Sequence, residues 1–151
     1  MSQERHYQQP GRIQQLFLNP TVAFFTRHGM SLAGSRVLQV AGRSSGQPRR
    51  TPVNLLTVDG QPYLVSARGH GQWVRNLRVA GNGELWLGKR VERFSAEEIA
   101  DADKIELLRA YLNRWKWEVG AFFDGVGPKA SDEEILAIAP KHPIFRVTID
   151  K

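Results

Sequence analysis

The feature that most restricts the fold of this chain is the dipeptide Asp59-Gly60, which separates two strand-like runs at residues 52–58 and 63–67. Both residue types tolerate the positive φ angles of a two-residue hairpin turn, so the pattern predicts two antiparallel strands joined by a tight turn. Pro62 lacks a backbone N–H and pushes the start of the second strand toward an edge position. We therefore expect a fold that contains an antiparallel sheet.

Other segments supply further strands and several helices. Short strand-like runs lie at residues 37–41, 84–88, 91–94 and 144–149. Residues 72–80 indicate a short helix, and helical patterns also occur at residues 13–17 and from Asn19-Pro20 to Gly29. Two capping-box patterns, Ser95–Glu98 and Ser131–Glu134, predict a helix from 95 to about 119 and a shorter one that stops before Pro140.

Strands and helices do not alternate regularly along the chain, which argues against a doubly wound nucleotide-binding fold. The elements add up to an α+β fold with about six short, mostly antiparallel strands in a small barrel-like sheet and with flanking helices. The 151 residues contain no repeat and no low-complexity linker. We expect a disordered N-terminus at residues 1–10 and a single domain over residues 11–151.

Positive charge is concentrated in the front half of the chain. Between Arg5 and Gly83 there are ten arginines, no lysine and one acid, Asp59, whereas thirteen acids face eleven lysines and arginines from Glu84 onward. The arginine guanidinium grips carboxylates and phosphates with two hydrogen bonds. An anionic partner for the front half is therefore expected, with a solvated basic surface as the alternative.

Several catalytic classes lack their signature residues in this chain. There is no cysteine, no phosphate-binding G-x-x-x-x-G-K-[ST] loop, no H-E-x-x-H pair and no G-x-S-x-G elbow. The four histidines are scattered, so we expect no metal site. If the protein is an enzyme, a cofactor should carry the chemistry.

The chain carries no apolar run of the roughly 20 residues that span a bilayer, and its first residues are too polar for a signal peptide. The absence of cysteine suits the reducing cytoplasm, which we expect as the location. The apolar stretch from Leu16 to Phe25 permits a peripheral membrane contact.

The stretch from Gly42 to Pro52 holds three arginines in a turn between two predicted strands. Glycines allow successive backbone N–H groups to face one way, which makes a concavity for anions. Ser44, Ser45 and Thr51 add hydroxyl donors, and Arg43 and Arg49 lie on either side of the turn, where they could close on one phosphate. A solvated loop with no ligand is the competing interpretation.

A second cluster follows the predicted hairpin, where residues 67–73 end a strand and begin the short helix. A helix N-terminus flanked by Arg68 is a further anion site. Asn76 lies on the same side of that helix as Trp73 and could hydrogen-bond a polar ring edge. The alternative places Trp73 and Leu77 in the core and the arginines in solvent.

At these two clusters the sequence resembles the deazaflavin-dependent nitroreductase family. The likeness rests on G-R-x-[ST]-G-x-P-R-x-x-P at residues 42–52 and W-x-x-N-L-[RK] at residues 73–78, and it runs from about Leu38 to Ile149. It implies the split β-barrel of flavin-binding proteins and an oxidoreductase that uses reduced coenzyme F420 (F420H2). Quinones, activated alkenes such as enones, and nitroaromatic compounds are the hydride acceptors that it implies.

The resemblance also implies which residues contact the coenzyme, a polyanion with a phosphate and a glutamate tail. The first group is Arg43, Ser44, Ser45, Arg49, Arg50, Thr51, Pro52, Val53 and Asn54. The second group is Val65, Ser66, Ala67, Arg68, Gln72, Trp73, Val74, Arg75 and Asn76. This chain departs from the family pattern at Ser44, where many members carry lysine, and at Val74, where an aromatic residue or histidine is common.

Some members of the family place tyrosines near the substrate from their C-terminal region. The matching stretch here contains Tyr111, a candidate proton donor, and Trp115 and Trp117, which could stack on a flat substrate. The helical spacing of Tyr111 and Trp115 equally fits the buried face of a helix.

Two rival functions remain open from the sequence. One is the same barrel holding FMN, and the other is a non-catalytic domain that binds nucleic acid or an acidic membrane surface. If the protein is an enzyme, we expect its partner to be a small-molecule hydride acceptor and not a nucleic acid. It would act as a monomer or as a homodimer.

Overall fold

The computed structural model describes residues 34–150, apart from the side chains of residues 116–119. Six strands form a closed antiparallel barrel in the order β1-β2-β3-β6-β5-β4. They are β1 (Ser35–Ala41), β2 (Pro48–Val58), β3 (Gln61–Val65), β4 (Asn82–Leu87), β5 (Arg90–Glu98) and β6 (Ile144–Ile149). The predicted α+β fold with about six antiparallel strands is confirmed.

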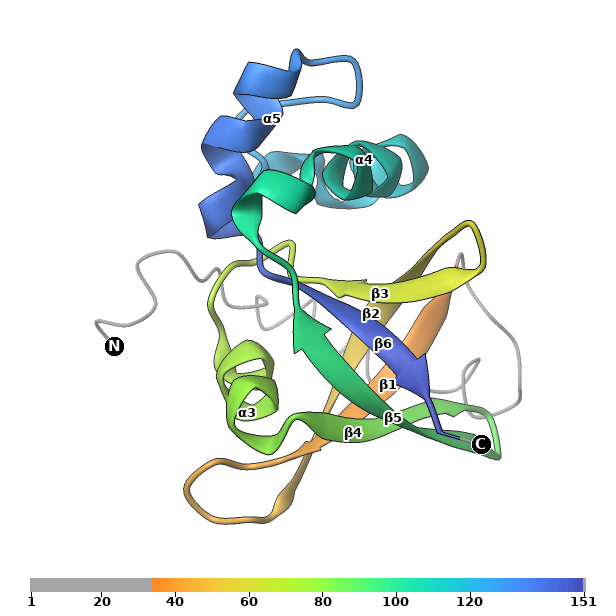
Figure 1. Cartoon of the computed structure of the whole chain (residues 1–151). Coiled ribbons are helices and arrows are strands. Elements are labelled where there is room, and N and C mark those ends of the chain that lie inside the picture. Colours follow the sequence, from red (N-terminus) through yellow and green to blue (C-terminus); the bar gives the residue numbers. More distant parts are fainter. Residues whose placement is uncertain (1–33, 151) are drawn as a thin grey trace.

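Helices flank this barrel on two sides, as Figure 1 shows. Helix α3 (Gln72–Ala80) connects β3 to β4. Helices α4 (Ile105–Val119) and α5 (Asp132–Ile138) belong to the chain segment that connects β5 to β6, and they lie together on the other side of the barrel. Short 3₁₀ turns at Asp101–Asp103, Gly120–Phe122 and Ala139–Lys141 connect them. Within residues 34–150, none of the helices is long and apolar enough to cross a membrane.

The hairpin that the sequence predicted joins β2 to β3. Asp59 and Gly60 have φ angles of 51° and 79°, which are the positive values that a tight two-residue turn needs. The strands pair from Leu55 opposite Leu64 to Val58 opposite Gln61. Pro62 lies opposite Thr57 within the β3 ladder rather than before it.

The helix predicted from Ser95 is wrong, because residues 95–98 belong to β5. Ser95 pairs with Thr148 and Glu98 with Phe145, so these residues supply the hydrogen bonds that close the barrel against β6. The side chain of Glu98 accepts hydrogen bonds from Arg78 instead of capping a helix. The helix itself begins later, at Ile105.

The second capping box is confirmed. Ser131 Oγ accepts a hydrogen bond from the backbone N–H of Glu134, and the Glu134 carboxylate accepts one from the N–H of Ser131. The predicted bounds 72–80 and 144–149 match α3 and β6. The helices expected before Gly29 and the disordered segment 1–10 lie outside the described residues.

Two apolar clusters hold the fold together. The first fills the barrel and is closed by Val74 and Leu77 of α3, which pack against strand residues such as Leu38, Leu55 and Phe145. The second lies between the outer face of β2 and β3 and the helices α4 and α5. Because side chains alternate along a strand, Leu55 points into the barrel and its neighbour Leu56 into the helical cluster.

Candidate functional site

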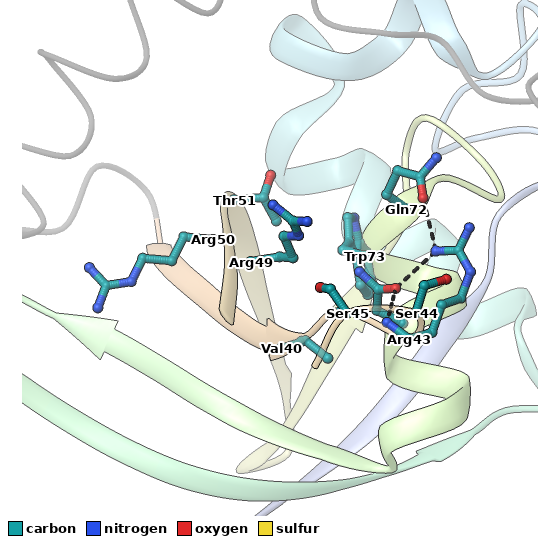
Figure 2. A pocket seen from close by; sticks show the side chains of 11 residues that line it. Val40, Arg43, Ser44, Ser45, Arg49, Arg50, Thr51, Gln72 and Trp73 are labelled. Carbon is teal, nitrogen blue, oxygen red and sulfur yellow. Dashed lines mark hydrogen bonds between the residues drawn. The ribbon is translucent and has the colours of Figure 1, made fainter. Parts of the chain in front are cut away.

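A pocket of about 530 Å³ opens where β1, β2 and α3 meet. This volume is within the range of small-molecule and cofactor sites. Both clusters that the sequence singled out contribute to its wall (Figure 2). Its lining residues are Val40, Gly42, Arg43, Ser44, Ser45, Arg49, Arg50, Thr51, Gln72, Trp73 and Asn76.

Because side chains alternate along β2, the adjacent residues Arg49 and Arg50 point to opposite sides of the strand. Arg49 and Thr51 lie on the same side of the strand as Leu55, which faces the barrel interior. Figure 2 shows Arg49 on the pocket side and Arg50 pointing away from it. Within residues 34–150, no hydrogen bond or ion pair engages the Arg49 guanidinium.

Arg50 is engaged on the outside of the barrel. Its Nε donates a hydrogen bond to Gln39 Oε1 at 2.7 Å, and its guanidinium lies 4.5 Å from the centre of the Trp86 ring. Gln39 is the cross-strand neighbour of Arg50 in the β1–β2 ladder. Although Arg50 borders the pocket, its positive charge is therefore directed toward the outside of the barrel.

The turn between β1 and β2 is closed by its own hydrogen bonds. The N–H of Gly42 donates to Gln47 O at 2.8 Å, and the N–H of Gly46 donates to Gly42 O at 2.8 Å. Ser45 Oγ accepts a hydrogen bond from the N–H of Gln47 at 3.1 Å. The predicted concavity requires backbone N–H groups that are free to bind an anion. The N–H groups of Gly42, Gly46 and Gln47 instead donate hydrogen bonds within the turn.

Arg43 is directed at α3. Its Nη1 donates to Gln72 Oε1 at 2.8 Å and to Asn76 Oδ1 at 2.9 Å, and its backbone N–H also donates to Asn76 Oδ1, at 3.0 Å. The predicted pairing of Arg43 and Arg49 around one phosphate is not preformed in this arrangement.

The end of β3 and the residues after it lie against the helical layer and are not part of the pocket lining. Val65 is buried under α4, and Ser66 donates from Oγ to Gly69 O and from its N–H to Pro143 O. Arg68 lies 4.3 Å over the Phe122 ring. Ala67 packs against the same apolar cluster.

The remaining predicted contacts divide between the core and the strand faces. Trp73 lines the pocket and packs 6.0 Å from the Phe145 ring, whereas Val74 is buried in the barrel core. Val53 packs against that core, and Arg75 donates from Nε to His70 O at 3.1 Å. Pro52 and Asn54 alternate with Val53 on β2 and are not lining residues.

The candidate substrate residues on α4 lie in the helical cluster. Tyr111 and Trp115 are buried, with their ring centres 5.0 Å apart, and neither lines the pocket. Their burial matches the alternative that the sequence left open, the inner face of a helix. The side chain of Trp117 lies outside the described part of the structure.

His142 is a buried histidine that the sequence did not point to. Its Nδ1 donates to Ser66 O at 3.1 Å, and its ring stacks on Phe123 with centres 4.0 Å apart. Burial lowers the pKa of the imidazole from 6.5 to about 4, so it is neutral at physiological pH. This neutral side chain ties the segment after β3 to the helical layer.

Val40 and Gly42 line the pocket although neither was among the predicted coenzyme contacts. Val40 shares the inward face of β1 with Leu38, a signal that strand alternation alone could have supplied. A Cβ on Gly42 would lie 3.0 Å from Ser45 Oγ and 3.4 Å from Arg49 Nε, so a side chain there would fit only with a small shift of these neighbours. Among the described residues, no group of three or more His, Cys, Asp or Glu side chains could hold a metal ion.

Solved structures with a similar fold include reductases and proteins with other roles. An F420-H2 dependent reductase, FDR-A, is 14% identical with a TM-score of 0.53, and the match covers 76% of this chain and 94% of that one. The conserved hypothetical protein Rv2991 from Mycobacterium tuberculosis is 18% identical with a TM-score of 0.51, covering 87% and 81%. The heme storage protein HutZ from Vibrio cholerae is 15% identical with a TM-score of 0.50, covering 89% and 90%. These matches establish the split-barrel fold.

No curated protein sequence matches the chain. A family model does match: that of the F420H(2)-dependent quinone reductases aligns with residues 15–118. The aligned region includes the turn at residues 42–47, all of β2 and the whole of α3. The chain therefore belongs to the F420H2-dependent quinone reductase family and is an F420H2-dependent oxidoreductase.

Proposed function

We propose that this protein transfers a hydride from F420H2, bound in the pocket between β2 and α3, to a quinone or another electron-poor acceptor such as an enone or a nitroaromatic compound. The observation that carries the proposal is the position of Arg49. Its guanidinium faces a pocket of about 530 Å³ whose wall also carries hydroxyl groups and the Trp73 ring.

The pocket residues fit the chemistry of such a coenzyme. An arginine and the hydroxyls of Ser44 and Thr51 suit a phosphate, because a guanidinium and hydroxyl donors satisfy its oxygens. Trp73 and Val40 offer apolar surface to a flat ring system. FMN also combines a flat ring with a phosphate, so it remains the rival ligand and has to be tested in parallel.

In this proposal the chain's own residues bind, orient and shield. Arg49 would hold the anionic part, Trp73 and Val40 would pack on the ring, and the wall would keep water from one face. When bound, the reduced deazaflavin supplies a hydride as a two-electron donor. The protein would then raise the rate of acceptor reduction by holding the acceptor in the correct orientation against the coenzyme ring.

Within residues 34–150, the pocket lining offers none of the side chains that usually donate a proton in such a reduction. Among the described lining residues there is no carboxylate, imidazole or phenol. We therefore propose that the proton which completes reduction of the acceptor comes from solvent at the open side of the pocket. Tyr111 remains the alternative donor from the sequence.

Acceptor-dependent oxidation of F420H2 tests this function. Purified protein would be mixed with F420H2 and a panel of quinones, enones and nitroaromatics, and formation of oxidised coenzyme would be followed, with heat-denatured protein as the control. We expect turnover with at least one electron-poor acceptor, and a quinone first. Loss of F420 binding together with tight FMN binding would overturn the choice of coenzyme.

The proposal also includes the setting in which the enzyme works. A chain without cysteine fits the reducing cytoplasm, and the acceptor is a small molecule. A salt-sensitive association with acidic vesicles in the absence of any reductase activity would instead favour the non-catalytic surface-binding alternative.

A further inference from the structure

Asn76 on α3 is a buried side chain committed to one residue of the neighbouring turn. It is 4% exposed, and its Oδ1 accepts two hydrogen bonds from Arg43, one from the backbone N–H at 3.0 Å and one from Nη1 at 2.9 Å. The same Nη1 reaches Gln72 Oε1, which lies one helical turn earlier on the same face of α3. Arg43 is thus held at both its backbone and its side chain.

These bonds attach an otherwise self-contained turn to the helix. The hydrogen bonds of Gly42, Ser45 and Gly46 all stay within the turn or at its base. Within the described chain, the hydrogen bonds recorded between residues 42–47 and α3 are the three that Arg43 donates. Two of them end on one buried oxygen atom, so the position of the turn depends on Asn76.

The position of the turn also determines the position of Arg49. A Cβ at Gly42 would lie 3.4 Å from Arg49 Nε, which shows that the Arg49 side chain runs back across the turn. If the turn shifted away from α3, the Arg49 side chain would lose the neighbouring surface at Gly42 against which it lies, and its direction toward the pocket would change.

We propose that Asn76 is a positioning residue, which fixes Arg43 and the turn 42–47 on α3 and so keeps Arg49 directed into the coenzyme pocket. The proposal rests on the proposed function, since it takes F420 as the ligand of that pocket. Arg43 is then a strut, because its guanidinium donates to the side-chain amide oxygens of Gln72 and Asn76. Arg49 is the residue that binds the anion. Asn76 acts through Arg43 and not by contact with the coenzyme ring.

The first test compares Asn76→Ala with Gln72→Ala. Oxidised F420 would be titrated into each variant, and thermal unfolding would confirm that each is folded. Asn76→Ala should weaken binding about tenfold, because it removes both bonds to Asn76 Oδ1, including the one that links the turn backbone to α3 within residues 34–150. Gln72 also lines the pocket, so Gln72→Ala serves as a comparison: it removes one exposed bond and leaves the turn backbone bonded to Asn76, and it should weaken binding less than Asn76→Ala does.

Hydrogen exchange at the Arg43 amide gives a readout without any ligand. The amide is bonded to Asn76 Oδ1, so it should exchange about tenfold faster in Asn76→Ala than in the wild type, while the amides of β6 keep their rates. Asn76→Asp retains an oxygen at the same place and should restore slow exchange. Equal exchange in wild type and Asn76→Ala would overturn the proposal.

Arg43→Ala separates a strut from an anion ligand. Titrations at high ionic strength screen the long-range effect of removing one charge. A strut predicts that Arg43→Ala weakens binding no more than Asn76→Ala does, and that the double variant resembles Asn76→Ala. A much larger loss in Arg43→Ala would make Arg43 a direct ligand and overturn the assignment.

The failure of this inference differs from the failure of the proposed function. If the wild type does not bind F420, the proposed function fails, whatever the exchange rates show. If the wild type binds F420 and Asn76→Ala binds it equally well, the positioning role alone is refuted.

Discussion

Replacement of Arg49 by alanine should weaken F420 binding by about 1.5–3 kcal/mol, the scale of a hydrogen bond to a charged group. This corresponds to about a 10- to 150-fold increase in the dissociation constant. The reason is the side of β2 on which Arg49 lies. Its guanidinium faces the pocket, and within residues 34–150 no hydrogen bond or ion pair of that guanidinium competes with a ligand.

Arg50→Ala is the matched control, because it removes the same charge one residue away. Arg50 is engaged with Gln39 and Trp86 outside the barrel, so its loss should change F420 binding less than about threefold at physiological salt, where charges are screened over about 8 Å. Fluorescence titration of oxidised F420 measures both variants. Equal losses in the two variants, or unchanged binding in Arg49→Ala, would refute the alternation argument.

Three further variants test other parts of the structure. Tyr111→Phe should leave the rate of acceptor reduction within about twofold, because Tyr111 lies in the helical cluster; a loss of about 100-fold, the scale of general acid catalysis, would restore it as proton donor. The neutral imidazole of His142 has its pKa lowered to about 4, so the folded state loses stability as pH falls from about 6.5 to about 4, by about 3 kcal/mol in all. His142→Asn should flatten that part of the stability profile in urea unfolding, and an unchanged slope would contradict it. Gly83→Ala places a Cβ 2.7 Å from the Gln39 carbonyl oxygen across the β1–β4 pairing and should cost about 1–3 kcal/mol in the same assay; full stability would show that β4 can move there.

Local chemistry explains which parts of the fold could be predicted. Asp59-Gly60 and the Ser131–Glu134 capping box specify their own geometry over a few residues, and both appear as expected. The Ser95–Glu98 pattern is equally good locally, but the β6 strand, about fifty residues later in the sequence, offers those residues a ladder of backbone hydrogen bonds. A pattern within one segment carries no information about that partner.

The region of the candidate pocket was predictable from the sequence, but the directions of its side chains were not. Glycines, arginines and a predicted helix start marked the turn at 42–47 and the start of α3 as candidate anion sites, and the family resemblance implied that both contact one coenzyme. The sequence placed the start of the strand at Pro52, whereas β2 begins at Pro48 and includes both arginines. Only that longer strand reveals that Arg49 and Arg50 point in opposite directions.

The contact between Asn76 and Arg43 could not be predicted from the sequence for a similar reason. The sequence predicted that Asn76 lies on the same side of the helix as Trp73, from which we expected that it could hydrogen-bond the polar edge of a bound ring. Its oxygen is instead occupied by Arg43, thirty-three residues earlier in the chain, a contact that depends on how α3 packs against the barrel.

The most direct test of the account is an amide-resolved NMR titration of the wild-type protein with oxidised F420, with FMN titrated in parallel. The account predicts saturable shifts for F420 at residues 42–51 and 72–76, around the pocket between β2 and α3, and unchanged signals in α5. Shifts centred on another part of the molecule, or saturation by FMN without any response to F420, would contradict the account.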